Sequence, residues 1–456
     1  MRENAARRLI DHALSVDWSA LPPESQSAAK TFLHDTLAVG VAGRSDRLAD
    51  TVFAAAEGWA GQIGTSLVLG RPGARLTAPY AAFVNAYQIH CQEYDCVHEP
   101  AVAHPMATVG AALLGEAGRS GPYNGAEFLS ALIAGVDIVA SLGVAVKGPL
   151  KFFRPATAGI FGSVAAISRL RQLSPDIAQA AFGHALAFAS GTMQAHVEGK
   201  PTLAIQVAAA ARSAVEAIDL AVAGFPAPYE SLDGPFGYFA LFENDVELGP
   251  FLDQLGQRQR IQELSWKPFP TGRAAHGAIV ALQTLMKQDG VSAANLASFV
   301  YRAPPLIARL VGRRPQPGMS VNYARLCFAW LGANVLKNGT VMLSDFTQTN
   351  LSEPELLGLA EKISVQADDN GDLAAFVPAT GVATLVDGRE IQIVVSRQFG
   401  SPEWPLSREE HLEKASACLA FGGCPDRAKA LETLMSTFET VEDASGALCR
   451  VFESEP

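Results

Sequence analysis

The chain has 456 residues, of which 49% are hydrophobic and 18% are charged, and its formal net charge at pH 7 is -11. This composition excludes a disordered chain and leaves enough apolar residues for more than one core. An acidic surface disfavours non-specific binding to nucleic acid or anionic lipid, so we expect neither partner.

The cysteines and the most apolar segments indicate the cellular compartment in which the protein works. The six cysteines have irregular spacings and no CxxC pair, which indicates reduced thiols. Residues 1–16 contain acids and lack a long apolar core, which predicts an amphipathic helix instead of a signal peptide. Residues 128–148 form the most apolar long run, but Asp137 and several glycines favour a buried helix over a membrane span. We therefore expect a cytoplasmic protein without a membrane partner.

The pattern is helical from residue 1 to about residue 260. Small and apolar residues recur at three- and four-residue spacing between breaks at Gly and Pro. The many Ala and Gly residues allow helices to approach closely. The clearest predicted helices are residues 25–43, 78–90, 105–118, 125–146, 157–170, 174–190 and 202–224.

The pattern changes after Trp266. Four β-branched or alternating runs predict strands, and the last two flank Asp387-Gly388, which is typical of a hairpin turn. Helical patterns interrupt these runs, and a helix returns after Ser407, which forms a capping box with Glu410. The predicted strands lie at residues 297–304, 362–370, 380–388 and 389–399, and the helices between them at residues 276–290 and 322–336.

These elements predict a mainly α protein with two domains. A large all-α helical domain would be built from both chain ends, residues 1–266 and 399–456. A smaller α+β domain would occupy residues 267–398.

One polar segment, CQEYDCVHEPAVAHP at Cys91–Pro105, concentrates acids, histidines and cysteines. The spacing of His98 and His104 matches a metal site weakly, and the two cysteines match a redox site more weakly. Because histidine titrates near neutral pH, the segment favours acid/base chemistry. The alternative of a helix-end loop whose histidines and acids cap one another stays open.

Three further segments carry cationic or imidazole side chains beside apolar helices. The first precedes a helix whose first-turn N–H groups could bind an anion. The second is a Gly-flanked loop, and the third lies at the junction of the predicted domains, where pockets are common. Together they predict an anion-binding cleft, although surface solvation would explain any one of them. The candidates are Arg154 and Thr157 in the first segment, His196 and Lys200 in the second, and Lys267, Arg273 and His276 in the third.

The order and spacing of these motifs resemble the MmgE/PrpD family along nearly the whole chain. Residues 79–105 resemble its N-G-x-x-x-H, D-[FY]-D-D and H-P signature, and residues 154–173 its H-x-T-x-T-x-G-x-F-G segment. The other matching segments are residues 34–43, 220–239, 266–282 and 322–339.

The resemblance implies a large helical domain, a smaller α+β domain and a homodimer. It also implies an enzyme without metal or cofactor, a lyase or isomerase that abstracts a proton next to a carboxylate of a small substrate. Dehydration, decarboxylation and epimerisation all remain open, and cations would stabilise the enolate-like charge.

Within this family frame, His104 would be the principal acid/base and Asp95 would orient His98 or His104. Lys267, with Lys200 if it reaches the site, would bind or protonate the substrate. The remaining substrate-binding candidates are Arg154, Thr157, His196, Arg273 and His276.

Several positions depart from the family pattern. The D-[FY]-D-D motif reads Glu93-Tyr94-Asp95-Cys96, the histidine of the third segment is Arg154, and Cys327 replaces a serine. The family lysine and histidine are missing near residues 203–206. These changes predict a substrate with fewer or differently placed carboxylates. The alternative function is an inactive, carboxylate-binding or scaffold homologue.

Overall fold

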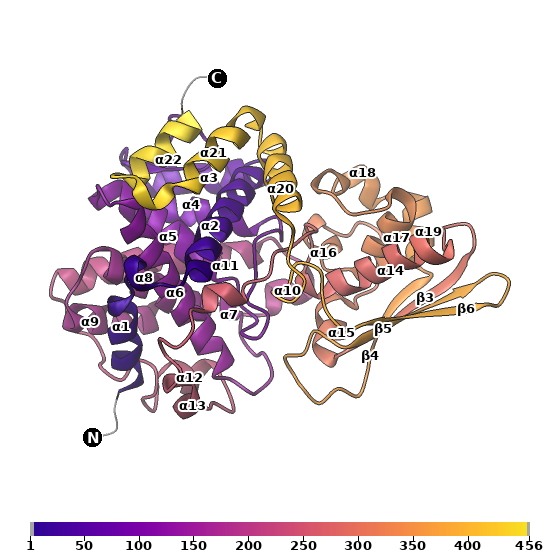
Figure 1. The fold of residues 1–456 in the computed structure, drawn as a ribbon, viewed down its shortest axis with the longest axis horizontal. Helices are drawn as coiled ribbons and strands as arrows, with labels where there is room; N and C mark the ends of the chain where they lie inside the picture. Colours follow the sequence, from indigo (N-terminus) through magenta and orange to yellow (C-terminus); the bar gives the residue numbers. More distant parts are fainter. Residues whose placement is uncertain (1–3, 454–456) are drawn as a thin grey trace. The chain divides into compact units, whose positions relative to one another are not determined.

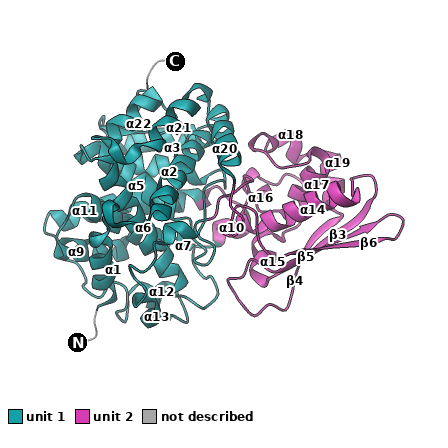
Figure 2. Cartoon of the chain, in the orientation of Figure 1, with its two compact units in different colours: residues 1–193, 204–264, 407–456 teal, residues 194–203, 265–406 magenta. Residues whose placement is uncertain are grey.

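The computed structural model describes residues 4–453, and the chain divides into two compact units (Figures 1 and 2). Unit 1 comprises residues 1–193, 204–264 and 407–456, and unit 2 comprises residues 194–203 and 265–406. The mainly α class with a small α+β part is confirmed. Residues 194–203, assigned by the sequence to the helical domain, fall in unit 2.

Unit 1 is a stack of helices around an Ala- and Gly-rich core. Helix α4 packs against α5, α6 packs against α8, and α2 packs against both α4 and α20, so the two chain ends share one core. Its helices include α1 (Ala5–Ser15), α2 (Pro23–Gly43), α3 (Ala49–Ala60), α4 (Ala78–His90), α5 (Pro105–Ser120), α6 (Gly125–Val144), α7 (Arg154–Thr157), α8 (Gly159–Leu170), α9 (Pro175–Phe188), α12 (Tyr238–Phe242), α13 (Leu248–Leu252), α20 (Arg408–Phe421), α21 (Ala428–Ser436) and α22 (Ala444–Glu453). Helix α11 (Thr202–Val222) begins at the boundary with unit 2.

Helix α6 is long and apolar enough to span a membrane by length and composition alone, and no other helix in the described chain meets this criterion. However, 89% of its most apolar window is buried inside the protein, as expected for a core helix. Its start is fixed by a capping box between Asn124 and Glu127. The capping box predicted for Ser407 and Glu410 is confirmed at the start of α20.

Unit 2 contains a four-stranded sheet in the order β4-β3-β5-β6. Strand β3 (Leu296–Ala303) pairs parallel with β4 (Ile363–Ala367) and antiparallel with β5 (Ala379–Leu385). The predicted hairpin is confirmed, because β5 and β6 (Glu390–Val395) pair antiparallel and Gly388 has a φ of 87° in the turn.

Helices cover one face of this sheet. α14 (His276–Asp289) packs against β5 and β6, and α17 (Phe328–Asn338) packs against β4 and α14. The second helix predicted in this region is interrupted, since a separate turn, α16 (Val321–Ala324), precedes α17. The remaining helices of unit 2 are α10 (Gln194–Glu198), α15 (Pro305–Val311), α18 (Gln348–Leu351) and α19 (Pro354–Ala360).

A buried histidine pair joins the two chain ends in unit 1. Nδ1 of His34 on α2 lies 2.8 Å from Nε2 of His411 on α20. Burial and the neighbouring His411 lower the pKa of His34 to about 4. Burial, Lys414 and Arg408 lower the pKa of His411 to about 4. The folded protein therefore keeps both imidazoles neutral where an unfolded chain would protonate them.

This pair predicts acid sensitivity. Between pH 6.5 and 4 the unfolded state binds more protons than the folded state, so stability falls as the pH falls through this window. One pKa unit corresponds to about 1.4 kcal/mol, so each histidine lowers the free energy of unfolding by an amount on the order of 3 kcal/mol across this window. Urea unfolding at pH 7, 6 and 5 should show a shallower fall for His411→Gln than for the wild-type protein. Equal slopes would contradict this assignment.

Candidate active site

The polar segment predicted from the sequence connects α4 to α5. His90 is the last residue of α4, and His104 occupies the N-cap position of α5, immediately before Pro105. A residue before proline is restricted to extended conformations, which limits the orientations available to His104. Glu93 and Val102 have φ values of 50° and 48°, a backbone conformation that residues other than glycine rarely adopt. Such conformations persist where surrounding contacts impose them, commonly at functional sites.

Asp95 lies between two histidines. Its Oδ2 is 3.0 Å from Nδ1 of His104 and 3.1 Å from Nδ1 of His90. The Asp95 and His90 side chains are 0% and 1% exposed, whereas that of His104 is 14% exposed. His104 is therefore the member of this cluster that solvent or a small molecule can reach.

The hydrogen bonds define which histidine nitrogen can exchange a proton. An ionised carboxylate is only an acceptor, so Nδ1 of each histidine carries a hydrogen and donates a hydrogen bond to Asp95. Nε2 is then the basic atom of a neutral His104, and Asp95 stabilises the imidazolium when Nε2 is protonated. Asp95 therefore orients His104, one of the two histidines that the sequence offered as its partner.

His90 was not among the predicted site residues. It ends an apolar helix and stands in the place of the histidine of the N-G-x-x-x-H motif, which is the signal that could have identified it. Its ring centroid lies 4.9 Å from that of His104. Ligand atoms of His90, Asp95 and His104 all lie within 4.8 Å of one another, so these residues could also hold a metal ion.

His98 has a different environment from the one predicted. Its Nδ1 accepts a hydrogen bond from the Ala101 N–H at 3.1 Å, and its Nε2 lies 2.7 Å from Oε2 of Glu263. Burial would raise the pKa of Glu263, but the hydrogen bond from His98 and the charge of Arg260 hold this pKa below its ordinary value. Both nitrogens of His98 thus have partners other than Asp95, and its catalytic role stays a prediction.

Arg154, predicted to bind substrate, is 3% exposed and has internal partners. Its Nε and Nη2 donate to the two carboxylate oxygens of Glu243 at 2.9 and 3.0 Å, and its Nη1 donates to the Ala101 carbonyl at 2.7 Å. Tyr238 also donates to Glu243, at 2.9 Å. Burial and Glu243 raise the pKa of Tyr238 well above its ordinary value, so its hydroxyl remains a donor. Arg154 thus anchors the segment between α4 and α5.

The same segment packs closely against α6. A Cβ atom added at Gly143 would lie 2.7 Å from the Ala101 carbonyl oxygen, which is closer than real contacts allow. Ala101 is therefore fixed by Gly143, Arg154 and His98.

Thr157 and Lys200 have different surroundings, and their binding of an anion stays a prediction. The Thr157 N–H donates to the Phe153 carbonyl at 3.2 Å, so this first-turn group is not available to an anion. The Thr157 side chain is 0% exposed. Lys200 is exposed after α10, and His196 is buried in unit 2 with Arg313, whose Nη2 donates to the His196 carbonyl at 2.9 Å.

The other predicted substrate-binding residues lie inside unit 2. Lys267 is 0% exposed and Arg273 is 4% exposed. Nη1 of Arg273 donates to the carbonyls of Trp266 and Phe399, at 3.1 and 2.7 Å, and lies 3.3 Å from Nδ1 of His276. The structure thus brings Arg273 and His276 together. Their binding of substrate, like that of Lys267, stays a prediction.

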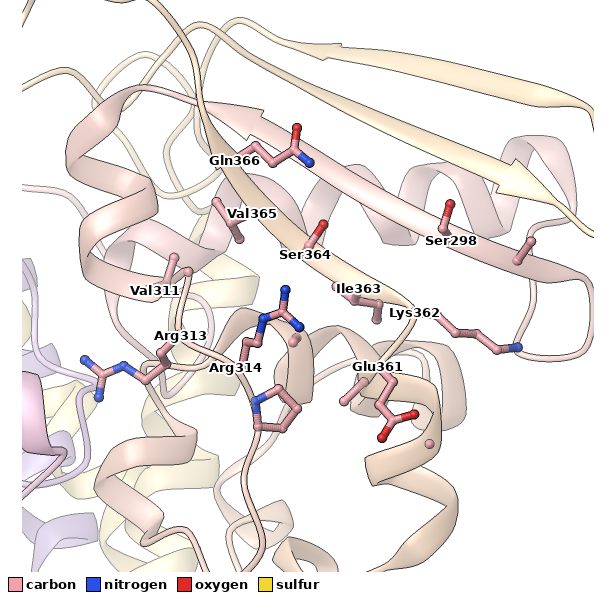
Figure 3. Close-up of a pocket in the computed structure, with 16 residues that line it drawn as sticks. Ser298, Val311, Arg313, Arg314, Glu361, Lys362, Ile363, Ser364, Val365 and Gln366 are labelled. Atoms are coloured by element: carbon pink, nitrogen blue, oxygen red, sulfur yellow. The ribbon is translucent and has the colours of Figure 1, made fainter.

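A separate cavity of about 890 Å³ lies beside β4 in unit 2 (Figure 3). The Arg314 side chain points toward β4, whereas those of Arg313 and Glu361 point away from it. None of the residues predicted to form the active site lines this cavity. Its lining contains cationic residues and Glu361 but no histidine, and we assign it no catalytic role.

Comparisons with known proteins agree with the site's motifs. The MmgE/PrpD N-terminal domain matches residues 7–250 and the MmgE/PrpD C-terminal domain matches residues 269–440. The cis-aconitate decarboxylase of Homo sapiens is 27% identical, with 91% of this chain and 88% of the relative covered. The cis-aconitate decarboxylase-like protein oryM of Aspergillus oryzae is 25% identical over 98% of this chain and 97% of the relative. The chain belongs to the MmgE/PrpD family.

Proposed function

We propose that the protein is a lyase that decarboxylates a small unsaturated polycarboxylate of the cis-aconitate type. The part-exposed His104, held by buried Asp95, carries the proposal, because it is an acid/base group with one defined reactive nitrogen. The similarity to cis-aconitate decarboxylases supports the choice of substrate class.

The proposed reaction breaks one C–C bond and forms one C–H bond. As CO2 leaves, the electron pair of the broken C–C bond forms a new double bond to the neighbouring carbon, and the π pair of the original double bond shifts to that bond's far carbon. This far carbon takes a proton from Nε2 of the His104 imidazolium. His104 regains this proton from solvent, and Asp95 keeps the ring oriented throughout. No redox step and no co-substrate other than this proton are needed.

Substituting His104 tests the proposal. His104→Gln should lower kcat for cis-aconitate by roughly 10²–10⁴, since general acid/base catalysis supplies a factor of this size. NMR of the reaction in deuterated water should show loss of CO2 with one deuteron incorporated into the product.

The control histidine is His184, whose Nε2 lies 3.0 Å from the Phe225 carbonyl oxygen in unit 1. His184→Gln should keep near wild-type turnover if the protein remains folded. Full activity of His104→Gln would overturn the assignment. Binding of cis-aconitate without turnover would instead favour the inactive carboxylate-binding homologue. Loss of activity with a chelator, restored by a divalent metal, would indicate a metal at His90, Asp95 and His104.

Arg154 is left out of the proposed substrate contacts because Glu243 already neutralises it. Breaking this buried pair with Glu243→Gln leaves an uncompensated cation, which costs roughly 3–5 kcal/mol. Urea unfolding should detect this loss, whereas Arg154→Met combined with Glu243→Gln should recover most of the stability. A large rise in KM with unchanged stability would contradict the structural role.

We also propose that the protein acts as a homodimer. Residues 188–241 expose several large apolar side chains, including Phe236, which is 77% exposed, and Phe225, which is 61% exposed. Exposed apolar side chains that form one patch are characteristic of protein–protein interfaces, and we propose that these side chains contribute to the contact between subunits. Analytical ultracentrifugation should show a dimer that Phe236→Asp weakens, while Ile63→Asp, at a position that is 89% exposed, leaves it intact. A monomeric wild-type protein would contradict the proposal.

A further inference from the structure

We propose that Asp35 and Lys414 are a positioning pair that holds Asp95 in place for His104. This inference rests on the proposed function. Neither residue touches the reacting groups in the proposed mechanism. Both act through the backbone of the segment between α4 and α5.

The pair is buried where the two chain ends meet. Asp35 on α2 is 1% exposed and Lys414 on α20 is 6% exposed. Nζ of Lys414 lies 2.7 Å from Oδ1 of Asp35. The same Nζ donates a hydrogen bond to the Tyr94 carbonyl at 3.0 Å and lies 4.3 Å from the centroid of the Tyr94 ring. One ammonium therefore contacts both the backbone and the side chain of the residue that precedes Asp95.

The hydrogen bond to Tyr94 constrains Asp95 directly. The Tyr94 carbonyl belongs to the peptide plane that leads into Asp95, so fixing this carbonyl fixes the direction in which the Asp95 backbone begins. The preceding residue, Glu93, has a φ of 50°, a conformation that needs support from its surroundings. Lys414 fixes the next residue, Tyr94, from a helix 320 residues away along the chain.

Asp35 holds the Lys414 side chain in this buried position, because its Oδ1 lies 2.7 Å from Nζ. Without this partner the Lys414 side chain would have one polar contact fewer to fix its direction toward Tyr94. The ion pair itself is weak support for stability, because an apolar pair of similar volume often replaces a buried ion pair without loss. An apolar pair would, however, lack the hydrogen-bond donor that contacts the Tyr94 carbonyl.

Two double variants separate positioning from stability. Asp35→Asn with Lys414→Met removes both charges and the donor, whereas Asp35→Asn with Lys414→Gln removes both charges but keeps an N–H donor. Glu413→Gln, on the exposed side of α20, is the matched control. We expect the Met variant to lower kcat for cis-aconitate at least about tenfold with KM nearly unchanged, as for a loss restricted to the transition state. The Gln variant and the control should stay within about threefold of wild type.

A second readout does not depend on the substrate. In protein with ¹⁵N-labelled histidine, the Nδ1 resonance of His104, assigned with His104→Gln, reports its hydrogen bond to Asp95. This resonance should shift in the Met variant and remain in place in the Gln variant and the control. If the wild-type protein does not turn over cis-aconitate, the proposed function fails while this resonance still tests the positioning pair.

The results that overturn the inference are specific. A Met variant with wild-type kcat, or with an unmoved His104 resonance, removes any positioning role. If the Met variant does not fold, the Gln variant decides. A folded Gln variant with a displaced His104 resonance would contradict the role of the donor, and an unmoved resonance would support it.

Discussion

The hydrogen bonding of one buried carboxylate sets the requirements for the rest of unit 1. Asp95 has no exposure, so its charge must be matched by donors that the protein supplies. Two of them come from helix ends, His90 at the end of α4 and His104 before the start of α5. Both helices must therefore end and begin at fixed places, and the segment between them must turn sharply enough to bring Asp95 between the two rings.

The substituted pocket position follows the same rule of charge matching. Where the family motif has a histidine, this chain has Arg154, and Glu243 and Tyr238 accompany it. A buried guanidinium without a carboxylate would be strongly unfavourable. An arginine at this position therefore requires a buried carboxylate beside it, which Glu243 supplies. Arg154 also donates to the Ala101 carbonyl, so it anchors the segment that carries His104.

Local patterns predicted much of this structure. Helix periodicity located α2, α4, α5 and α6, and the Asp-Gly turn located the hairpin. The pairing of Asp95 with His104 spans only nine residues and could therefore also be predicted from the sequence. The partner of His98 is 165 residues away and that of Arg154 is 89 residues away. No local pattern reveals such partners, and a buried partner decides whether a charged residue is structural or available to substrate.

Gly143 links the hydropathy of α6 to the chemistry of the site. The segment bearing His104 lies so close to α6 that a single methyl group at this position would collide with Ala101. Close approach requires a small residue only at the point of contact, which Gly143 supplies near the end of α6. The rest of α6 is apolar because it packs against α8 and α5 in the core of unit 1, which is also why its composition resembles that of a membrane span. One core helix thus serves two purposes, since its buried length stabilises unit 1 and its last turn fixes the backbone that leads to His104.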